Sequence, residues 1–218
     1  MTEAEFLELV EAHTSLSSPP LCPELRTREA KLLVPAWEAA EKLAGGQVEP
    51  PFWAYSWAGS QALARFILDE PATVRSRVVL DLGCGNALGA MAAAMAGAAR
   101  AIACDIDPAA LWMARMNGAE NGVSLELEPG DLLVESPPVP PVEVVLAGDL
   151  FYARVLAGRV EPWLREAAAR GAVVLVGDPG RAYLPRSGLR ALASYDVPAT
   201  HEIEGVSRRR TLVYRLEG

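Results

Sequence analysis

The segment VVLDLGCGNALG, residues 78–89, passes from a buried-strand pattern through a glycine turn into a helical pattern. Asp81 lies near the end of the apolar run, and Gly83 and Gly85 follow before an alanine-rich stretch begins. Glycines at such a point let the backbone turn tightly and approach a ligand closely. Ligands of open α/β sheets bind beyond the carboxyl ends of the strands. This loop is therefore predicted to border a binding site.

Four short apolar runs alternate with helical patterns in the middle of the chain. They cover 77–83, 100–106, 142–149 and 171–178. Strands that alternate with helices predict βαβ units and a mostly parallel sheet. Strands that are apolar along nearly their whole length indicate a sheet with helices on both faces.

Weaker β patterns complete the predicted sheet. Residues 123–129 are typical of an edge strand, and residues 194–217 hold two late β-like segments with no helix between them. Two such neighbouring segments predict an antiparallel hairpin. The expected fold class is α/β: a Rossmann-like, seven-stranded, mostly parallel sheet that ends in an antiparallel C-terminal hairpin.

The first part of the chain has a different pattern. Residues 2–13 and 24–46 carry helical patterns, and we expect Pro35 to interrupt the second of them. We therefore expect a helical extension over residues 1–50. Residues 51–218 form the predicted α/β domain, and the whole chain forms one globular unit.

Charge and composition exclude several classes of protein. The net charge is −8 and the isoelectric point is about 4.9, whereas binding to nucleic acid requires a basic face. No apolar run reaches the roughly 18 to 20 residues that cross a bilayer. We therefore expect neither a nucleic-acid partner nor a membrane span. The N-terminus lacks the features of a secretory signal or a transit peptide, so we expect a cytoplasmic protein, and a monomer.

The cysteines and histidines give no sign of a metal site. Cys22, Cys84 and Cys104 show no C-x-x-C spacing, so neither a zinc site nor a disulfide framework is indicated. His13 and His201 each stand alone in the sequence. No bound metal is expected.

The spacing of the glycine loop separates two classes of cofactor. A dinucleotide fingerprint reads G-x-G-x-x-G, but Leu88 occupies its third glycine position and Gly89 follows it. Asp81 would repel a pyrophosphate, whereas it suits a ligand that carries an ammonium and a sulfonium group. The D-x-G-x-G pattern is similar to the loop of class I S-adenosylmethionine-dependent methyltransferases. A tight turn without a ligand is the alternative.

A second acid follows at the expected distance. Asp105 ends the run at 100–106, about 20 residues beyond the glycine loop, where an acid accepts hydrogen bonds from both ribose hydroxyls. Ile106 is grouped with it as a cofactor contact. Asp107 is predicted to cap the next helix, since a proline follows it. Asp131 and Leu132 are predicted to lie against the adenine, although a simple turn there stays an open alternative.

Several blocks together resemble one family, over about residues 50–182. Besides the glycine loop these are PFWAYSWAGSQALARFILDEP, VVLAGDLFY and GDPGR. They are similar to the seven-β-strand lysine methyltransferases that modify the β-subunit of electron transfer flavoprotein. This resemblance implies an N-methyltransferase that uses S-adenosyl-L-methionine and acts on a protein lysine. Related bacterial sequences are labelled nicotinamide N-methyltransferase-like, so a small-molecule enzyme is an alternative, as is a non-catalytic binding module.

The resemblance also implies roles for individual residues. It places Trp57 and Gly59 over the cofactor, although the family's W-P-G-G here reads W-A-G-S. A second departure is Ala153, where the family has an acid after D-x-F-Y. The first change keeps Gly59, whereas the second removes a carboxylate that could help to hold a target lysine.

The D-x-F-Y motif is the predicted catalytic wall. Methyl transfer to an amine is an in-line displacement, so the enzyme contributes mainly proximity, alignment and exclusion of water. In the family this position borders the transferred methyl group. We therefore expect Asp149 to orient the nucleophilic nitrogen, and Phe151 and Tyr152 to line the channel. The alternative is that Asp149 only caps the helix that follows.

Overall fold

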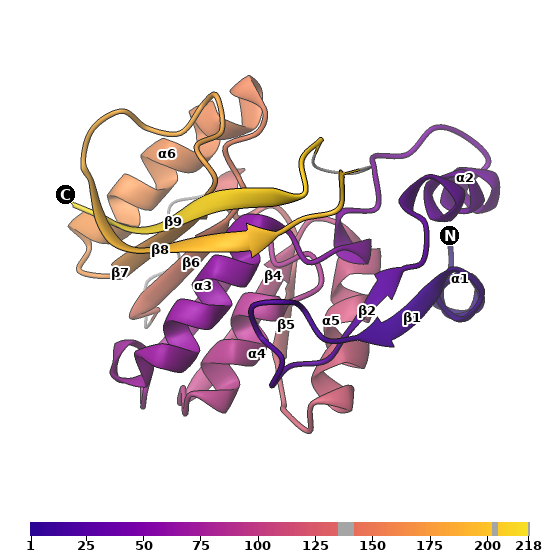
Figure 1. Ribbon diagram of the computed structural model, residues 1–218, viewed down its shortest axis with the longest axis horizontal. Coiled ribbons are helices and arrows are strands. Elements are labelled where there is room, and N and C mark those ends of the chain that lie inside the picture. The colour runs from indigo at the N-terminus through magenta and orange to yellow at the C-terminus, as the bar shows by residue number, and fades with distance from the viewer. Residues whose placement is uncertain (135–141, 202–204, 218) are drawn as a thin grey trace.

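The computed structural model describes residues 1–134, 142–201 and 205–217. Its central feature is a seven-stranded sheet with the strand order β5-β4-β3-β6-β7-β9-β8 (Figure 1). Pairing is parallel from β5 to β7 and antiparallel for β9 against both β7 and β8, which confirms the predicted fold class. The strands are β3 (Val78–Leu82), β4 (Arg100–Asp105), β5 (Glu126–Pro129), β6 (Val144–Gly148), β7 (Val173–Asp178), β8 (Leu189–Pro198) and β9 (Arg208–Leu216).

Helices cover the sheet on both faces, as the apolar strands predicted. One face carries α3 (Ala58–Asp69), α4 (Leu88–Met95) and α5 (Pro108–Glu120), and the other carries α6 (Arg154–Ala169). All residues of the central strands β3 and β6 are buried, because side chains on both faces pack under helices. In the described part of the chain, short 3-10 turns lie at η1 (Phe52–Ala54), η2 (Pro71–Thr73) and η3 (Leu132–Val134).

The N-terminal region differs from the prediction. It contains α1 (Glu3–His13) and α2 (Leu33–Ala44), but β1 (Thr14–Ser17) and β2 (Thr27–Ala30) lie between them as an antiparallel pair (Figure 1). The expected helix over 24–46 was therefore wrong in its first part. Contacts distant in sequence hold β2 in place, since the backbone N–H of Arg28 donates to the side-chain oxygen of Asn117 on α5 at 2.9 Å.

The expected interruption at Pro35 was also wrong. Pro35 lies in the first turn of α2, which begins at Leu33. A proline is tolerated there because the first N–H groups of a helix have no intrahelical acceptor. The helix ends where Gly45 adopts a left-handed conformation, with φ of 72°.

Candidate active site

The glycine loop after β3 has an alternating left-handed backbone. Gly83, Gly85 and Ala87 have φ values of 64°, 53° and 63°. A side chain at position 83 would also come within 2.8 Å of the Leu150 methyl group. The loop therefore turns between β3 and α4, beyond the carboxyl end of β3, in a conformation that glycine permits.

Asp81 anchors α4 to the end of β3. Its Oδ2 accepts a hydrogen bond from the Ala90 N–H at 2.8 Å. Gly89 makes this approach possible, because a Cβ there would lie 2.9 Å from the same oxygen. Burial raises the pKa of Asp81 to about 7, although the bond from Ala90 opposes the shift and the nearby charge of Asp105 adds to it.

Asp105 ends β4 directly beside the loop. Its two oxygens accept hydrogen bonds from the N–H groups of Gly85 and Asp107, each at 3.0 Å. Burial raises its pKa, and these backbone donors oppose that shift. The neighbouring Ile106 is 71% exposed. The predicted cap is confirmed: the Asp107 side chain accepts from the Ala109 N–H at 2.9 Å.

Asp131 lies at the end of β5, next to β4. The Gly130 N–H donates to the backbone oxygen of Asp105 at 3.1 Å, which joins the two strand ends. The Asp131 carboxylate is shared between the Leu133 N–H at 3.0 Å and the Arg159 guanidinium at 2.6 Å. Leu132 is partly buried against the core beneath α6. Contact of Asp131 and Leu132 with an adenine stays a prediction.

Asp149 is buried at the end of β6 and is held from two sides. Its Oδ2 accepts from the Ser60 N–H at 3.0 Å, in the first turn of α3, and its Oδ1 accepts two bonds from Arg181 at 2.7 and 3.1 Å. Burial raises its pKa to about 6, while Arg181 lowers it. The alternative that Asp149 caps the following helix was wrong, because the N-cap residue of α6 is Ala153 and no side chain caps the helix.

Arg181 lies in the site although the sequence patterns predicted no single role for it. The sequence of the GDPGR segment, residues 177–181, fits either a contact of Asp178 and Arg181 with the substrate or a simple turn. The turn exists, since Oδ1 of Asp178 accepts the N–H groups of Gly180 and Arg181, both at 2.7 Å. The Arg181 side chain then reaches Asp149, and its guanidinium carbon lies 6.0 Å from the centre of the Trp57 ring.

Gly59 brings α3 against the strand ends. A Cβ at this position would lie 2.2 Å from the backbone oxygen of Gly177 and 2.6 Å from Oδ2 of Asp149. Because Gly59 has no side chain, the N-terminus of α3, which is the positive end of the helix dipole, lies close to the buried carboxylate of Asp149. The structure places Gly59 in helix packing. Its contact with the cofactor stays a prediction.

Phe52, Tyr55 and Trp57 form one cluster at the same edge, whereas Trp53 is buried against Phe6 in the core beneath α1. Rings of Phe52 and Trp57 lie 5.8 Å apart, and Tyr55 meets Trp57 edge-on at 5.1 Å. The Trp57 indole N–H donates to the Phe52 carbonyl at 2.9 Å. Phe52 also contacts Tyr152 at 5.3 Å, so the cluster joins the end of β6.

Phe151 and Tyr152 point in different directions. Phe151 is 1% exposed and packs in the core beneath α6, so its burial argues for a packing role and against the expected channel wall. Tyr152 is 45% exposed at the rim. Burial raises the pKa of Tyr152, and the charges of Glu49 and Asp105 raise it further. Its hydroxyl therefore stays protonated near neutral pH, within electrostatic reach of Asp105, the acid that is predicted to bind the ribose.

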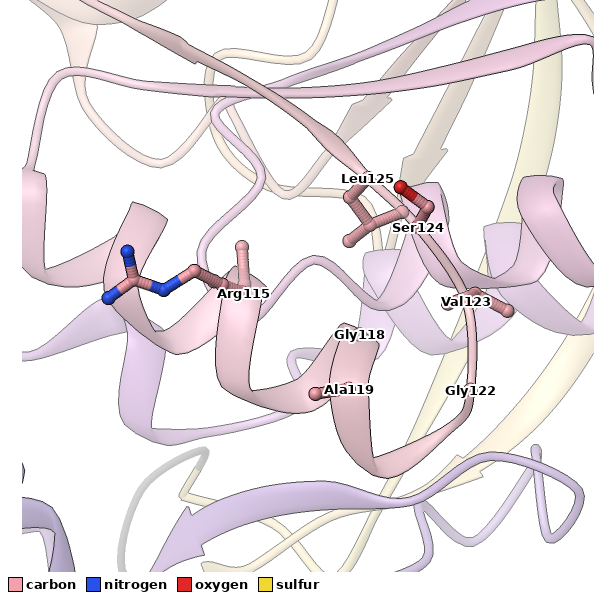
Figure 2. A pocket seen from close by; sticks show the side chains of 8 residues that line it. Arg115, Gly118, Ala119, Gly122, Val123, Ser124 and Leu125 are labelled. Atoms are coloured by element: carbon pink, nitrogen blue, oxygen red, sulfur yellow. The ribbon is translucent and has the colours of Figure 1, made fainter.

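Other features lie away from this edge. A shallow hollow of about 410 Å³ lies where α5 ends and the chain turns towards β5 (Figure 2). Small and apolar side chains dominate its lining, and its Arg115 forms an ion pair with Glu3. Within the described ranges no group of His, Cys, Asp and Glu is arranged to hold a metal, and no helix is long and apolar enough to cross a membrane.

Comparisons with known proteins agree with this geometry. The family description "Ribosomal protein L11 methyltransferase (PrmA)" matches residues 62–177. A solved structure of magnesium protoporphyrin IX methyltransferase from Synechocystis with bound S-adenosylmethionine shares the fold, with a TM-score of 0.51 and 15% identity, covering 72% of this chain and 78% of that one. The fold and the glycine-loop site thus define a class I S-adenosylmethionine-dependent methyltransferase.

The sequence relatives are more specific. The electron transfer flavoprotein β-subunit lysine methyltransferase of Xenopus laevis is 37% identical over 94% of this chain and 84% of its own length. The human protein of that name is 37% identical over 82% of this chain and 68% of its own length. The chain belongs to the family of electron transfer flavoprotein β-subunit lysine methyltransferases, and it is an enzyme whose methyl donor is S-adenosyl-L-methionine.

The residues at the edge of the sheet fit this cofactor. The Asp105 carboxylate accepts backbone bonds that include those from Gly85 and Asp107, and its two oxygens together offer about four acceptor positions, so acceptor capacity remains for a ribose hydroxyl. The exposed side chain of Ile106 offers an apolar surface to a flat base. Asp81 is buried and Asp105 is partly buried, and burial raises the pKa of each carboxyl group. A cationic ligand beside them favours their ionised form, so the pair suits such a ligand. When bound, the cofactor supplies an activated methyl group.

Proposed function

We propose that this enzyme methylates a lysine of the electron transfer flavoprotein β-subunit. The relatives that carry this name support the proposal, because the similarity covers nearly the whole chain. We further propose that it acts as a monomer in the cytoplasm.

The open rim at Tyr152 is the observation that carries the proposal. Tyr152 is 45% exposed and Tyr183, on the loop after β7, is 42% exposed. Enzymes for small molecules enclose their substrates in cavities. The exposed ring of Tyr152, which contacts Phe52 of the aromatic cluster, instead suits a lysine that projects from a protein surface.

The site residues have separate roles in this proposal. Among the described residues, Arg181 donates two hydrogen bonds to Oδ1 of Asp149 and the Ser60 N–H donates one to Oδ2, so the carboxylate keeps capacity for a further donor. The substrate amine is expected to donate there, which aims its lone pair. Aromatic walls at Trp57 and Tyr152 disfavour the ammonium form by desolvation and exclude water from the reacting atoms. The open rim lets the released proton leave to solvent.

Isotope labelling tests the proposal. The enzyme is incubated with methyl-labelled S-adenosylmethionine and purified electron transfer flavoprotein, and in parallel with a whole-cell lysate. We expect label on the β-subunit, at a lysine that peptide mass spectrometry identifies. Label in the small-molecule fraction alone would support the nicotinamide-type alternative. Binding of S-adenosylhomocysteine without transfer to either fraction would support a non-catalytic module.

A further inference from the structure

Buried polar side chains connect the N-terminal region to the glycine loop. Thr27, Ser56, Asn86 and Asn117 are each at most 2% exposed. They come from β2, the aromatic segment, the glycine loop and α5. None of them stood out in the sequence. Buried polar groups are costly unless they are satisfied, so a connected set of them specifies one arrangement of the segments that carry it.

Ser56 is the centre of this network. Its Oγ accepts from the Asn86 side-chain amide at 2.8 Å and lies 3.4 Å from the Thr27 hydroxyl. Its backbone oxygen accepts from the Gln61 side chain at 2.7 Å, in α3. Ser56 thus joins β2 and α3 to the side chain of the loop residue.

Asn117 holds the backbone of the same loop residue. Its amide nitrogen donates to the Asn86 carbonyl at 3.0 Å. Its side-chain oxygen accepts the N–H of Arg28 on β2 at 2.9 Å. The side chain and the carbonyl of Asn86 are therefore both fixed. Strand β2 supports each of them, through Thr27 and Ser56 for the side chain and through Arg28 and Asn117 for the carbonyl.

Asn86 lies where the loop conformation needs support. It follows Gly85, whose N–H bonds to the ribose acid Asp105, and precedes Ala87, a non-glycine residue with φ of 63°. A left-handed alanine costs roughly 1–2 kcal/mol and persists only where the surroundings determine it. The hydrogen bonds to Asn86 supply that constraint, because they fix the residue between Gly85 and Ala87 in the loop that is predicted to contact the cofactor.

We infer that Ser56 and Asn117 are positioning residues for the cofactor. They act through Asn86 and hold the peptide groups of 83–87 and the Asp105 carboxylate in the geometry that binds S-adenosylmethionine. The N-terminal region, through β2, belongs to the cofactor site and does not form an independent extension. The inference concerns the methyl donor, so it holds whichever acceptor the enzyme uses.

Asn121 offers a matched control on the same helix face. It pairs with Arg26, accepting from its N–H at 2.8 Å and donating to its carbonyl at 2.7 Å. It therefore also ties the N-terminal region to α5. Its other hydrogen bonds go to Asn117 and Met91, so it lacks the link to Asn86.

Calorimetric titration with S-adenosylhomocysteine tests the inference. Ser56→Ala and Asn117→Ala are expected to weaken binding about tenfold or more, which corresponds to roughly 1.4 kcal/mol. Asn121→Ala is expected to lower the melting temperature and to leave the affinity within about twofold. All titrations are run well below the melting temperature of the least stable variant. The two test variants reach Asn86 from opposite sides, so either one suffices if the other does not fold.

Steady-state kinetics separate a role in positioning the cofactor loop from a general loss of stability. With saturating acceptor, we expect the KM for S-adenosylmethionine to rise in Ser56→Ala and Asn117→Ala while kcat changes little. Wild-type affinity in these variants would overturn the inference. So would a loss of affinity in all three variants that simply follows their loss of thermal stability.

Discussion

The Arg181 guanidinium donates two hydrogen bonds, of 2.7 and 3.1 Å, to the same carboxylate oxygen of Asp149. The pair joins the loops after β6 and β7, and both side chains are largely buried. Burial alone favours the protonated acid, and the guanidinium opposes this, so that the pKa of Asp149 is about 6. Arg181 therefore keeps Asp149 ionised at neutral pH, as an acceptor for an amine requires.

Replacing Arg181 by glutamine is expected to shift the pH dependence of activity. The pKa of Asp149 then rises above about 6, so the acid limb of kcat/KM moves to higher pH and activity at pH 7 falls about tenfold or more. The measurement is kcat/KM between pH 5.5 and 9. Arg186→Gln, at an exposed position on the same loop, is the control. An unshifted acid limb in Arg181→Gln would contradict this role.

Local patterns predicted the sheet and the glycine loop, because each strand and turn is specified by residues adjacent in sequence. Contacts between distant segments were beyond such patterns. The β1–β2 pair depends on bonds from α5 to β2, and the partner of Asp149 lies 32 residues away on another loop. The motif also predicted that Phe151 and Tyr152 both line the channel, whereas Phe151 is buried in the core, because sequence spacing alone does not show on which side of the sheet's edge each ring packs.

Alanine substitutions at Phe151 and Tyr152 are expected to separate stability from activity. Phe151→Ala leaves a cavity beneath α6 and should cost roughly 3–5 kcal/mol in the free energy of unfolding. Tyr152→Ala, at a half-exposed ring, should cost about 1 kcal/mol or less and reduce methyl transfer at least tenfold. Urea unfolding and initial rates measure the two effects. If Phe151→Ala instead lost methyl transfer while keeping its stability, Phe151 would be a channel wall after all.

Glycine-to-alanine changes at two helical positions should have opposite signs. Gly59→Ala forces a Cβ to within 2.2 Å of the Gly177 carbonyl, so we expect a loss of about 3 kcal/mol or more. Gly158→Ala, within α6, meets nothing within 4 Å and should stabilise by about 0.5–1 kcal/mol, since alanine has the higher helix propensity. Thermal and urea unfolding check both. Comparable stability of the two variants would show that α3 can move away from the sheet.

Asp81 makes the stability of the enzyme depend on pH. Its pKa rises from the ordinary 3.8 to about 7 in the folded state, so the folded form binds the proton more tightly than the unfolded one. Its contribution therefore favours folding at low pH and is lost as the pH rises through about 4 to 7. Asp81→Asn keeps a side-chain oxygen that accepts the Ala90 N–H, and it has no carboxyl group to ionise, so its stability does not fall in this way as the pH rises. At pH 8 it should be more stable than wild type, by up to roughly 4 kcal/mol.

Urea unfolding at pH 5, 6.5 and 8 measures this difference. The gap between Asp81→Asn and wild type should widen with pH. Asp196→Asn, at a surface position, should leave the pH dependence as in wild type. Parallel curves for Asp81→Asn and wild type would mean that the carboxylate is better solvated or better paired than its burial indicates. We expect Asp81→Asn also to bind S-adenosylhomocysteine more weakly, because it removes a negative charge from the cofactor site.

Glu49 is expected to guide the substrate lysine to the rim. It is exposed, and its charge raises the pKa of Tyr152. The ring contact of Phe52 with Tyr152 places this segment beside the rim. Glu49 thus brings a carboxylate to the side of Tyr152, where Ala153 has none. Glu49→Gln should raise the KM for the protein substrate about threefold at low salt, because steering by exposed charges is screened as ionic strength rises.

Steady-state kinetics at low and high salt test this role of Glu49. The affinity for S-adenosylhomocysteine should stay at the wild-type value, since the change lies on the acceptor side. Glu70→Gln, an exposed acid that follows α3 at the opposite edge of the sheet, should leave the KM for the protein unchanged at both salt concentrations. An equal effect of the two variants would assign the steering to net charge and not to Glu49. An effect of Glu49→Gln that persists at high salt would instead indicate direct contact with the substrate amine.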